Sequence, residues 1–144
     1  MNKRTHRSQA GFTLLEIMLV VVIIGMLVGV ASWKLTGKIG QAKDVTTRQQ
    51  MDAYKMAIGS YELDNGFLPS TEQGLQALVA QPSSPPVPNN WKGPYLDPPV
   101  VKPDAWGHPF YYKCPGAKLP SSYDLYSPGP DGIEGNEDDV GNWQ

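Results

Sequence analysis

A cluster of C-terminal acids and a single glutamate near the N-terminus lie where a negative charge needs a compensating positive charge or solvent. Five acids fall within the nine residues from Asp131 to Asp139, with no lysine, arginine or histidine among them. Near the other end, Glu16 and Thr13 are the only polar residues of the stretch from Phe12 to Ala31. Because an ionised group in apolar surroundings is unfavourable unless it is paired, Glu16 requires a nearby positive charge. The C-terminal acids require solvent or a bound cation.

The C-terminal acids favour a hard cation such as calcium. Like charges this close repel one another unless they are solvated or bridged. Calcium takes roughly six to eight oxygen ligands, from carboxylates and backbone carbonyls, and Gly129, Gly132 and Gly135 permit the tight turns that present carbonyls. The segment contains no cysteine or histidine, which argues against zinc, and its spacing is not that of an EF-hand. The alternative is a disordered acidic tail, but Trp143 beyond the acids indicates that the end packs back on the protein.

The apolar stretch around Glu16 is long enough to cross a membrane. Its 20 residues would span about 30 Å as a helix, one hydrocarbon thickness. Lys3, Arg4 and Arg7 precede it and predict a cytoplasmic N-terminus. No lysine, arginine or histidine lies between Phe12 and Trp33 to neutralise Glu16 inside the bilayer. The alternative is that Glu16 lies at the interface and caps the N-terminus of a helix.

The elements that must position these groups begin with one long helix. After Ser32 the sequence becomes amphipathic, and Met51, Tyr54, Ile58 and Tyr61 recur on one helical face. Asp64-Asn65-Gly66 is a stop signal. We therefore expect a single helix of about 50 residues that runs from the membrane into a small head, with this stripe packed on the head.

The head itself is predicted to be small and rich in loops. Residues 70–73 resemble a capping box that opens a short second helix, and the proline-rich stretch 81–90 is expected to be a loop. Residues 109–113 and 123–127 are expected to be strands. The predicted fold class is α+β, with a long N-terminal membrane-spanning helix, a second short helix, a small antiparallel sheet and a C-terminal calcium loop. The single cysteine, Cys114, excludes an intrachain disulfide.

The residues from Gly11 to Glu16 (Gly-Phe-Thr-Leu-Leu-Glu) resemble the processing site of type IV pilins and type II secretion pseudopilins. This resemblance implies that a membrane aspartyl protease cuts between Gly11 and Phe12 and that the new amine of Phe12 is methylated. Glu16 becomes the fifth residue of the mature chain. The Phe12 amine is then the nearest positive charge, and Glu16 of one subunit is expected to meet it on a neighbouring subunit during assembly.

The resemblance extends into the head and narrows the family to the major type II pseudopilins. It rests on residues 71–78, on residues 104–110, where Ala105 replaces the usual proline, and on residues 123–132 and 141–143. The resemblance implies a structural calcium ion in the C-terminal loop. The implied side-chain ligands are Asp131, Asp138 and Asp139, and the implied backbone carbonyl ligands are Pro128 and Val140.

The expected organisation is a cleaved leader (1–11), a transmembrane and filament-core helix (12–32) and a periplasmic head (33–144). The resemblance implies a single-pass inner-membrane protein that polymerises into a periplasmic pseudopilus and helps drive folded proteins across the outer membrane. The implied partners are other copies of the chain, minor pseudopilins, the prepilin peptidase, the inner-membrane assembly platform and, before assembly, membrane lipid. The alternative is a type IV pilin for adhesion, motility or DNA uptake.

Other function classes lack support in the sequence. The net charge of -2 and the absence of a basic stripe argue against a nucleic-acid partner. No nucleophile signature, phosphate loop or metalloprotease motif is present, so neither an enzyme nor a membrane-anchored binding protein is favoured. His108 and Cys114 are interpreted as packing residues, since each stands alone.

Overall fold

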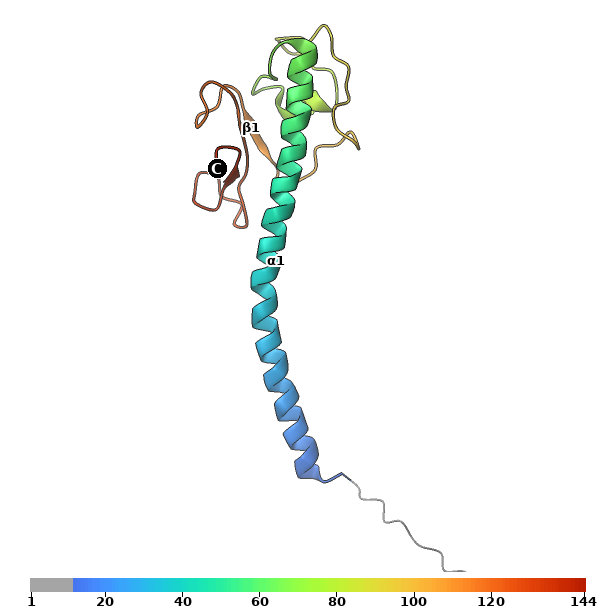
Figure 1. The fold of residues 1–144 in the computed structure, drawn as a ribbon, viewed down its shortest axis with the longest axis vertical. Helices are drawn as coiled ribbons and strands as arrows, with labels where there is room; N and C mark the ends of the chain where they lie inside the picture. The colour runs from blue at the N-terminus through green and yellow to red at the C-terminus, as the bar shows by residue number, and fades with distance from the viewer. Residues whose placement is uncertain (1–11) are drawn as a thin grey trace, which may run out of the picture. The chain divides into compact units, whose positions relative to one another are not determined.

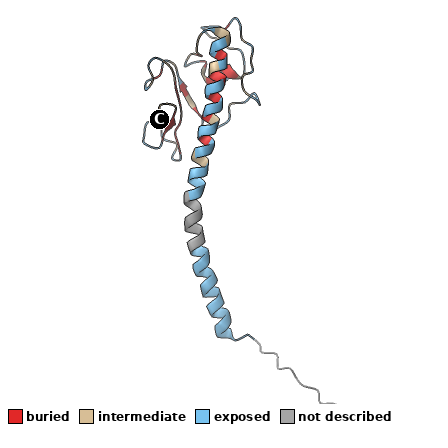
Figure 2. Cartoon of the chain, in the orientation of Figure 1, coloured by how far each residue is buried: buried red, intermediate tan, exposed pale blue. Residues whose placement is uncertain are grey.

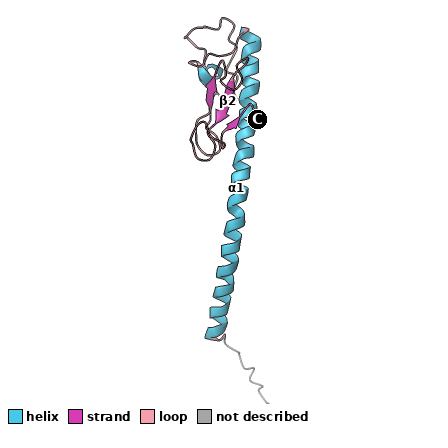
Figure 3. Cartoon of the chain, turned by 90° about the vertical axis from the view of Figure 1, so that its left-hand side faces the viewer, coloured by secondary structure: helices cyan, strands magenta, loops and turns pink. Residues whose placement is uncertain are grey.

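The computed structural model describes residues 12–144, and for residues 30–37 it describes the backbone only. The elements are helix α1 (Leu14–Asn65), the 3-10 helix η1 (Gly74–Leu78) and strands β1 (Tyr111–Lys113), β2 (Asp124–Ser127) and β3 (Val140–Gly141) (Figures 1 and 3). The chain divides into two compact units at Ile39–Gly40, a boundary that lies within α1. Gly11, on the N-terminal side of the predicted cleavage site, lies outside the described residues.

Helix α1 begins with a side-chain cap. The hydroxyl of Thr13 accepts a hydrogen bond from the backbone N–H of Glu16 at 3.2 Å. Glu16 therefore lies in the first turn, where the positive end of the helix dipole favours a carboxylate. The helix ends as expected, because Gly66 adopts a positive φ of 79° and its N–H donates to the carbonyl of Glu62 at 2.7 Å.

In the first unit, every residue from Phe12 to Gly29 is exposed, and the large apolar side chains among them are 45 to 81% exposed. Within the part of the chain that the structure describes, no helix has both the length and the apolar character needed to span a membrane. The predicted transmembrane segment, 12–32, includes residues 30–32, whose side chains lie outside that description.

In the second unit, the predicted stripe on α1 forms the core. Met51, Tyr54, Ile58 and Tyr61 are all buried. Figure 2 shows that buried residues, in red, lie along the C-terminal part of α1. They belong to one cluster with η1, β1 and β2, to which Leu78 and Leu125 contribute fully buried side chains. Burying a large apolar side chain stabilises the fold by about 1.5–3 kcal/mol, so this cluster is the main stabilising feature of the unit.

The short second helix is η1, a single 3-10 turn of five residues. The predicted capping-box contacts form ahead of it: Ser70 Oγ accepts from the N–H of Gln73 at 3.3 Å, and Gln73 Oε1 accepts from the N–H of Ser70 at 3.0 Å. Gly74 follows with a positive φ of 55°. A regular α-helix does not pass through that conformation, so the turn at residues 71–73 and η1 do not form one continuous helix.

The predicted antiparallel sheet is confirmed, with three strands in the order β1-β2-β3. Tyr111 pairs with Tyr126 across β1 and β2, and Ser127 pairs with Val140 across β2 and β3. The predicted strands 109–113 and 123–127 are real but shorter than expected. Strand β3 has only two residues, too few to give a recognisable alternation in the sequence.

Candidate functional site

The acidic segment (residues 129–139) is closed at its base by strands β2 and β3. Ser127 pairs with Val140 and Tyr126 with Gly141, and beyond these pairs the N–H of Asn142 donates to the carbonyl of Leu125 at 3.0 Å. Pro128 is fully buried and Val140 is 4% exposed, so both predicted carbonyl ligands belong to buried residues at this base. The two ends of the segment therefore meet, which is what a loop that encloses an ion requires.

Within the segment, Asp131 stabilises the first turn. Its Oδ1 accepts a hydrogen bond from the N–H of Ile133 at 2.9 Å, and its Oδ2 accepts one from Asn136 Nδ2 at 2.7 Å. Asn136 in turn accepts from the N–H of Asp138 at 2.9 Å. Asp131 is exposed, and each of its carboxylate oxygens accepts one hydrogen bond from the protein.

Asp139 differs from the other acids because its side chain is buried. The residue is 8% exposed, and its Oδ2 accepts from the N–H of Gly135 at 2.9 Å. Its Oδ1 is buried without a hydrogen-bond partner among the residues that the structure describes. An orphaned buried carboxylate oxygen is unfavourable unless a donor or a cation reaches it.

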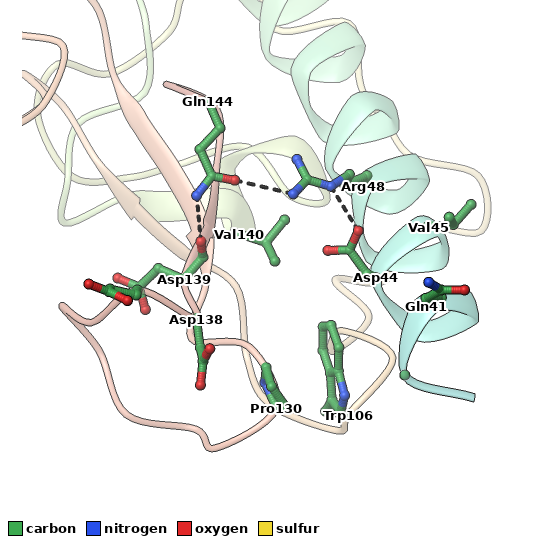
Figure 4. Close-up of a pocket in the computed structure, with 12 residues that line it drawn as sticks. Gln41, Asp44, Val45, Arg48, Trp106, Pro130, Asp138, Asp139, Val140 and Gln144 are labelled. Carbon is green, nitrogen blue, oxygen red and sulfur yellow. Dashed lines mark hydrogen bonds and ion pairs between the residues drawn. The ribbon is translucent and has the colours of Figure 1, made fainter. Parts of the chain in front are cut away.

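The donor types of this segment fit a hard cation, and the orphaned oxygen of Asp139 is an available ligand. The carboxylates are not gathered around one point, however. Figure 4 shows the side chains of Asp138 and Asp139 pointing in different directions. Over the described residues, no group of three or more acidic, histidine or cysteine side chains is placed to hold a metal.

Glu134, another acid of the segment, is a hydrogen-bond acceptor. Tyr126 donates its hydroxyl to Glu134 Oε2 at 2.7 Å. Burial, and then the bond to the Glu134 carboxylate, raises the pKa of Tyr126 above its ordinary value. The Tyr126 ring stacks on Tyr111 at 5.3 Å and lies 5.6 Å from the ring of Trp143. The prediction that Trp143 packs back on the protein is therefore confirmed.

A cavity of about 670 Å³ lies between the acidic segment and residues 40–48 of α1 (Figure 4). Arg48 bridges its two sides. Its Nε is 3.1 Å from Asp44 Oδ2, and one of its terminal nitrogens donates to Gln144 Oε1 at 3.2 Å. Gln144 donates to the carbonyl of Asp139 at 2.7 Å. This polar chain joins α1 to the acidic segment, and the sequence pattern did not predict it.

At the N-terminal site, Phe12 is 79% exposed and Glu16 is exposed. Glu16 lies in the first turn of α1, where the capping side chain is Thr13, whose hydroxyl accepts from the Glu16 N–H. The alternative in which Glu16 lies at the interface and caps the helix stays untested. Thr13 was missed as a functional residue, although Thr-x-x-Glu is the signature of a capping box. The pairing of Glu16 with Phe12 of a neighbouring subunit stays a prediction.

Known proteins similar to this chain match it over most of its length. Residues 34–143 match the family model described as type II secretion system (T2SS), protein G, and residues 6–32 match the prokaryotic N-terminal methylation motif. The type II secretion system core protein G of Pseudomonas aeruginosa is 46% identical over 142 residues, which cover 96% of this chain and 97% of that protein. The core protein G of Escherichia coli K12 is 40% identical over 141 residues, covering 97% and 94%.

A solved structure is also similar to this chain. The crystal structure of the major pseudopilin from the type 2 secretion system of enterohaemorrhagic Escherichia coli superimposes with a TM-score of 0.66 at 36% identity. The alignment covers 76% of this chain and 93% of that one.

Proposed function

The chain belongs to the type II secretion system protein G family, and from this premise we propose that it is the major structural subunit of a periplasmic pseudopilus. Its work is mechanical, because subunits add to a filament that helps drive folded proteins across the outer membrane. The observation that carries this proposal is the similarity to core protein G across 96% of the chain. The chain acts as a building block and not as an enzyme.

The N-terminal stretch is proposed to anchor the subunit before assembly and to pack in the filament core afterwards. Two observations support this role: the 20-residue sequence from Phe12 to Ala31 with only two polar side chains, and the match of residues 6–32 to the methylation motif. A helix that is apolar on all sides needs lipid or other helices around it. We place the head in the periplasm and the leader on the cytoplasmic side, where the peptidase cuts after Gly11 and the Phe12 amine is methylated.

Glu16 is proposed to guide the addition of each subunit. In an apolar filament core its carboxylate needs a cation, and the Phe12 amine of the adjacent subunit supplies one. The Thr13 cap is compatible with this role, because it uses the backbone N–H of Glu16 and not its carboxylate.

We also propose that the acidic segment binds one structural calcium ion. Asp131, Asp138 and Asp139 would hold it through carboxylate oxygens, and Pro128 and Val140 through their carbonyls. The supporting observations are the orphaned Oδ1 of Asp139 and the closure of the segment by β2 and β3. When bound, the ion would neutralise the repulsion among the acids and tie the C-terminal end to the sheet, where a disulfide is impossible.

The secretion function is tested by deletion of the gene and complementation. Deletion should leave secreted enzymes in the periplasm, and the wild-type gene should restore them to the medium. Glu16→Ala should fail to restore secretion although its leader is still removed, which mass spectrometry of the N-terminus measures. Glu62→Ala is the matched control, since Glu62 is an exposed glutamate of the same helix. Normal secretion together with lost surface fibres would contradict the proposal and favour a type IV pilin.

The calcium proposal has its own measurement. Addition of calcium to the chelated chain in detergent micelles should raise its melting temperature, because a ligand that binds only the folded state stabilises it. Asp139→Asn should abolish the increase, whereas Asp97→Asn, an exposed acid outside the segment, should not. Unchanged melting and unchanged protease resistance after chelation would refute calcium binding and leave the filament role intact.

A further inference from the structure

The imidazole of His108 lies against the first turn of the acidic segment. Its Nδ1 is 2.9 Å from the carbonyl oxygen of Gly129 and 3.8 Å from Asp104 Oδ2. Because both of these groups are acceptors, Nδ1 carries a proton and donates to Gly129. On the other side of the ring, Nε2 is 2.9 Å from the point where a Cβ on Gly132 would stand. The ring therefore supports the turn from Gly129 to Gly132.

Behind His108 lies a buried polar pair. The Asp104 side chain is 0% exposed, and its Oδ1 accepts hydrogen bonds from the N–H groups of Trp106 and His108 at 2.9 and 2.8 Å. Its Oδ2 accepts from the hydroxyl of Ser127, which is also fully buried. The Ser127 oxygen accepts in turn from the N–H of Gly129 at 3.0 Å. Both backbone polar groups of Gly129 are thus held by side chains that meet at Asp104.

Fixing Gly129 also fixes the far end of the acidic segment. Gly129 has a φ of 68°, and a Cβ at this position would overlap the carbonyl oxygen of Asp138. The backbone at one end is therefore packed directly on the backbone that carries Asp138 and Asp139. The turn around Asp104 is itself joined to α1, because the N–H of Ala105 donates to the buried hydroxyl of Thr47 at 3.2 Å.

We propose that His108, together with the buried Asp104–Ser127 pair, positions the acidic segment for ion binding before any ion arrives. These residues touch no ligand, and they act through Gly129 as positioning residues. The inference rests on the proposed calcium site. A segment whose ends are already ordered loses less conformational freedom when an ion binds, so the affinity is higher. The histidine that reads in the sequence as a packing residue has a directional hydrogen bond to the segment.

The test uses the full chain in detergent micelles, in EGTA and in a calcium titration. Removal of one hydrogen bond by His108→Ala should speed amide exchange in peptides covering 129–139 by about 3- to 10-fold in EGTA and should weaken calcium binding by a similar factor. His108→Asn places an amide donor near the position of Nδ1 and should restore most of both losses. The matched control is Thr71→Val, since the Thr71 hydroxyl makes the same kind of bridge to the backbone of Cys114, outside the acidic segment.

Faster exchange in His108→Ala, slower again in His108→Asn and unchanged in Thr71→Val would support the positioning role. Unchanged exchange in His108→Ala would overturn it, as would an equal increase in Thr71→Val, because the effect would then be a general loss of stability. A wild-type chain that binds no calcium would overturn the metal proposal and, with it, the statement that His108 prepares the segment for an ion. The exchange measured in EGTA still decides whether His108 orders the segment in that case.

Discussion

Within the unit that begins at Gly40, the inner face of α1 and the acidic segment are held by different forces. Ile58 and Tyr61 are at most 1% exposed and pack among apolar and aromatic side chains. In the acidic segment every residue from Pro130 to Asp138 except Gly132 is exposed, and hydrogen bonds of side chains to backbone maintain its path. Apolar burial makes the core insensitive to ions, whereas the segment depends on how its charges are satisfied.

This difference indicates that the core and the acidic segment have separate roles in a subunit that must assemble. The proposed calcium site would make the C-terminal segment respond to ionic conditions while the core of the head remains unchanged. The two regions are linked by the chain from Arg48 through Gln144 to Asp139. A second link runs from Thr47 through the turn at Ala105 and the Asp104–Ser127 pair to Gly129. Variants of either region should therefore have separable effects.

The largest effect is expected from a cavity in the core. Ile58→Ala should lower the free energy of unfolding by about 2–5 kcal/mol, because it removes buried methyl groups and leaves a void. Thermal unfolding of the chain in micelles, followed by near-ultraviolet circular dichroism, measures the loss. Met56→Ala, two residues away and 70% exposed, should change stability by less than about 0.5 kcal/mol. Equal losses in the two variants would mean that the stripe is not the stabilising face of α1.

The second effect tests the closed base of the acidic segment. Gly129→Ala should destabilise the segment by about 1–3 kcal/mol, because the residue has a positive φ and the new Cβ would overlap the carbonyl of Asp138. Gly135→Ala is the matched control, since Gly135 also has a positive φ (90°) but has open space around it. The rate of proteolysis of the C-terminal end in EGTA measures the destabilisation in each variant. If the two variants are cut at the same rate, the close packing of Gly129 on Asp138 is unimportant.

The same two regions differ in how far the sequence predicts them. The stripe from Met51 to Tyr61 was predicted correctly. A helix that packs on one side has apolar residues every three or four positions, and this period can be recognised in the sequence. The acids of the segment were found for their charge, but their arrangement depends on contacts between residues far apart, such as Ser127 with Asp104. Strand β3 and the role of His108 were missed for the same reason.

A third effect is the dependence of stability on alkaline pH. Burial raises the pKa of Tyr112, in the core, above its ordinary value near 10. Below pH 10 this tyrosine is protonated in both the folded and unfolded states, so its titration does not change the free energy of unfolding. Above pH 10 the unfolded chain releases the proton first, and stability falls by at most about 1.4 kcal/mol per pH unit.

Melting temperatures measured between pH 9 and 11.5 should therefore decline, and Tyr112→Phe should flatten the decline. The variant also loses the hydrogen bond from the Tyr112 hydroxyl to the carbonyl of Pro69, so its stability should be lower at neutral pH. The informative quantity is the slope. A slope identical to that of the wild type would show that the buried hydroxyl does not govern alkaline unfolding.

The smallest effect concerns the bridge between the two regions. Arg48 and Lys55 each form an ion pair with an aspartate on α1 at 3.1 Å, and their side chains are similarly exposed, 46% and 44%. Only Arg48 also reaches the C-terminal end, through its hydrogen bond to Gln144. Lys55→Ala should cost less than about 0.5 kcal/mol and Arg48→Ala about 0.5–1 kcal/mol, because exposed ion pairs contribute little.

High salt distinguishes the Arg48→Ala variant from the Lys55→Ala variant more clearly. At 1 M NaCl both ion pairs are screened, so the loss in Lys55→Ala should nearly vanish. Part of the loss in Arg48→Ala should persist, because its bond to the neutral amide of Gln144 is screened less. Unfolding measured at low and high salt gives both values. If the two losses vanish together, the bond from Arg48 to Gln144 contributes nothing measurable, and Arg48 acts only within α1.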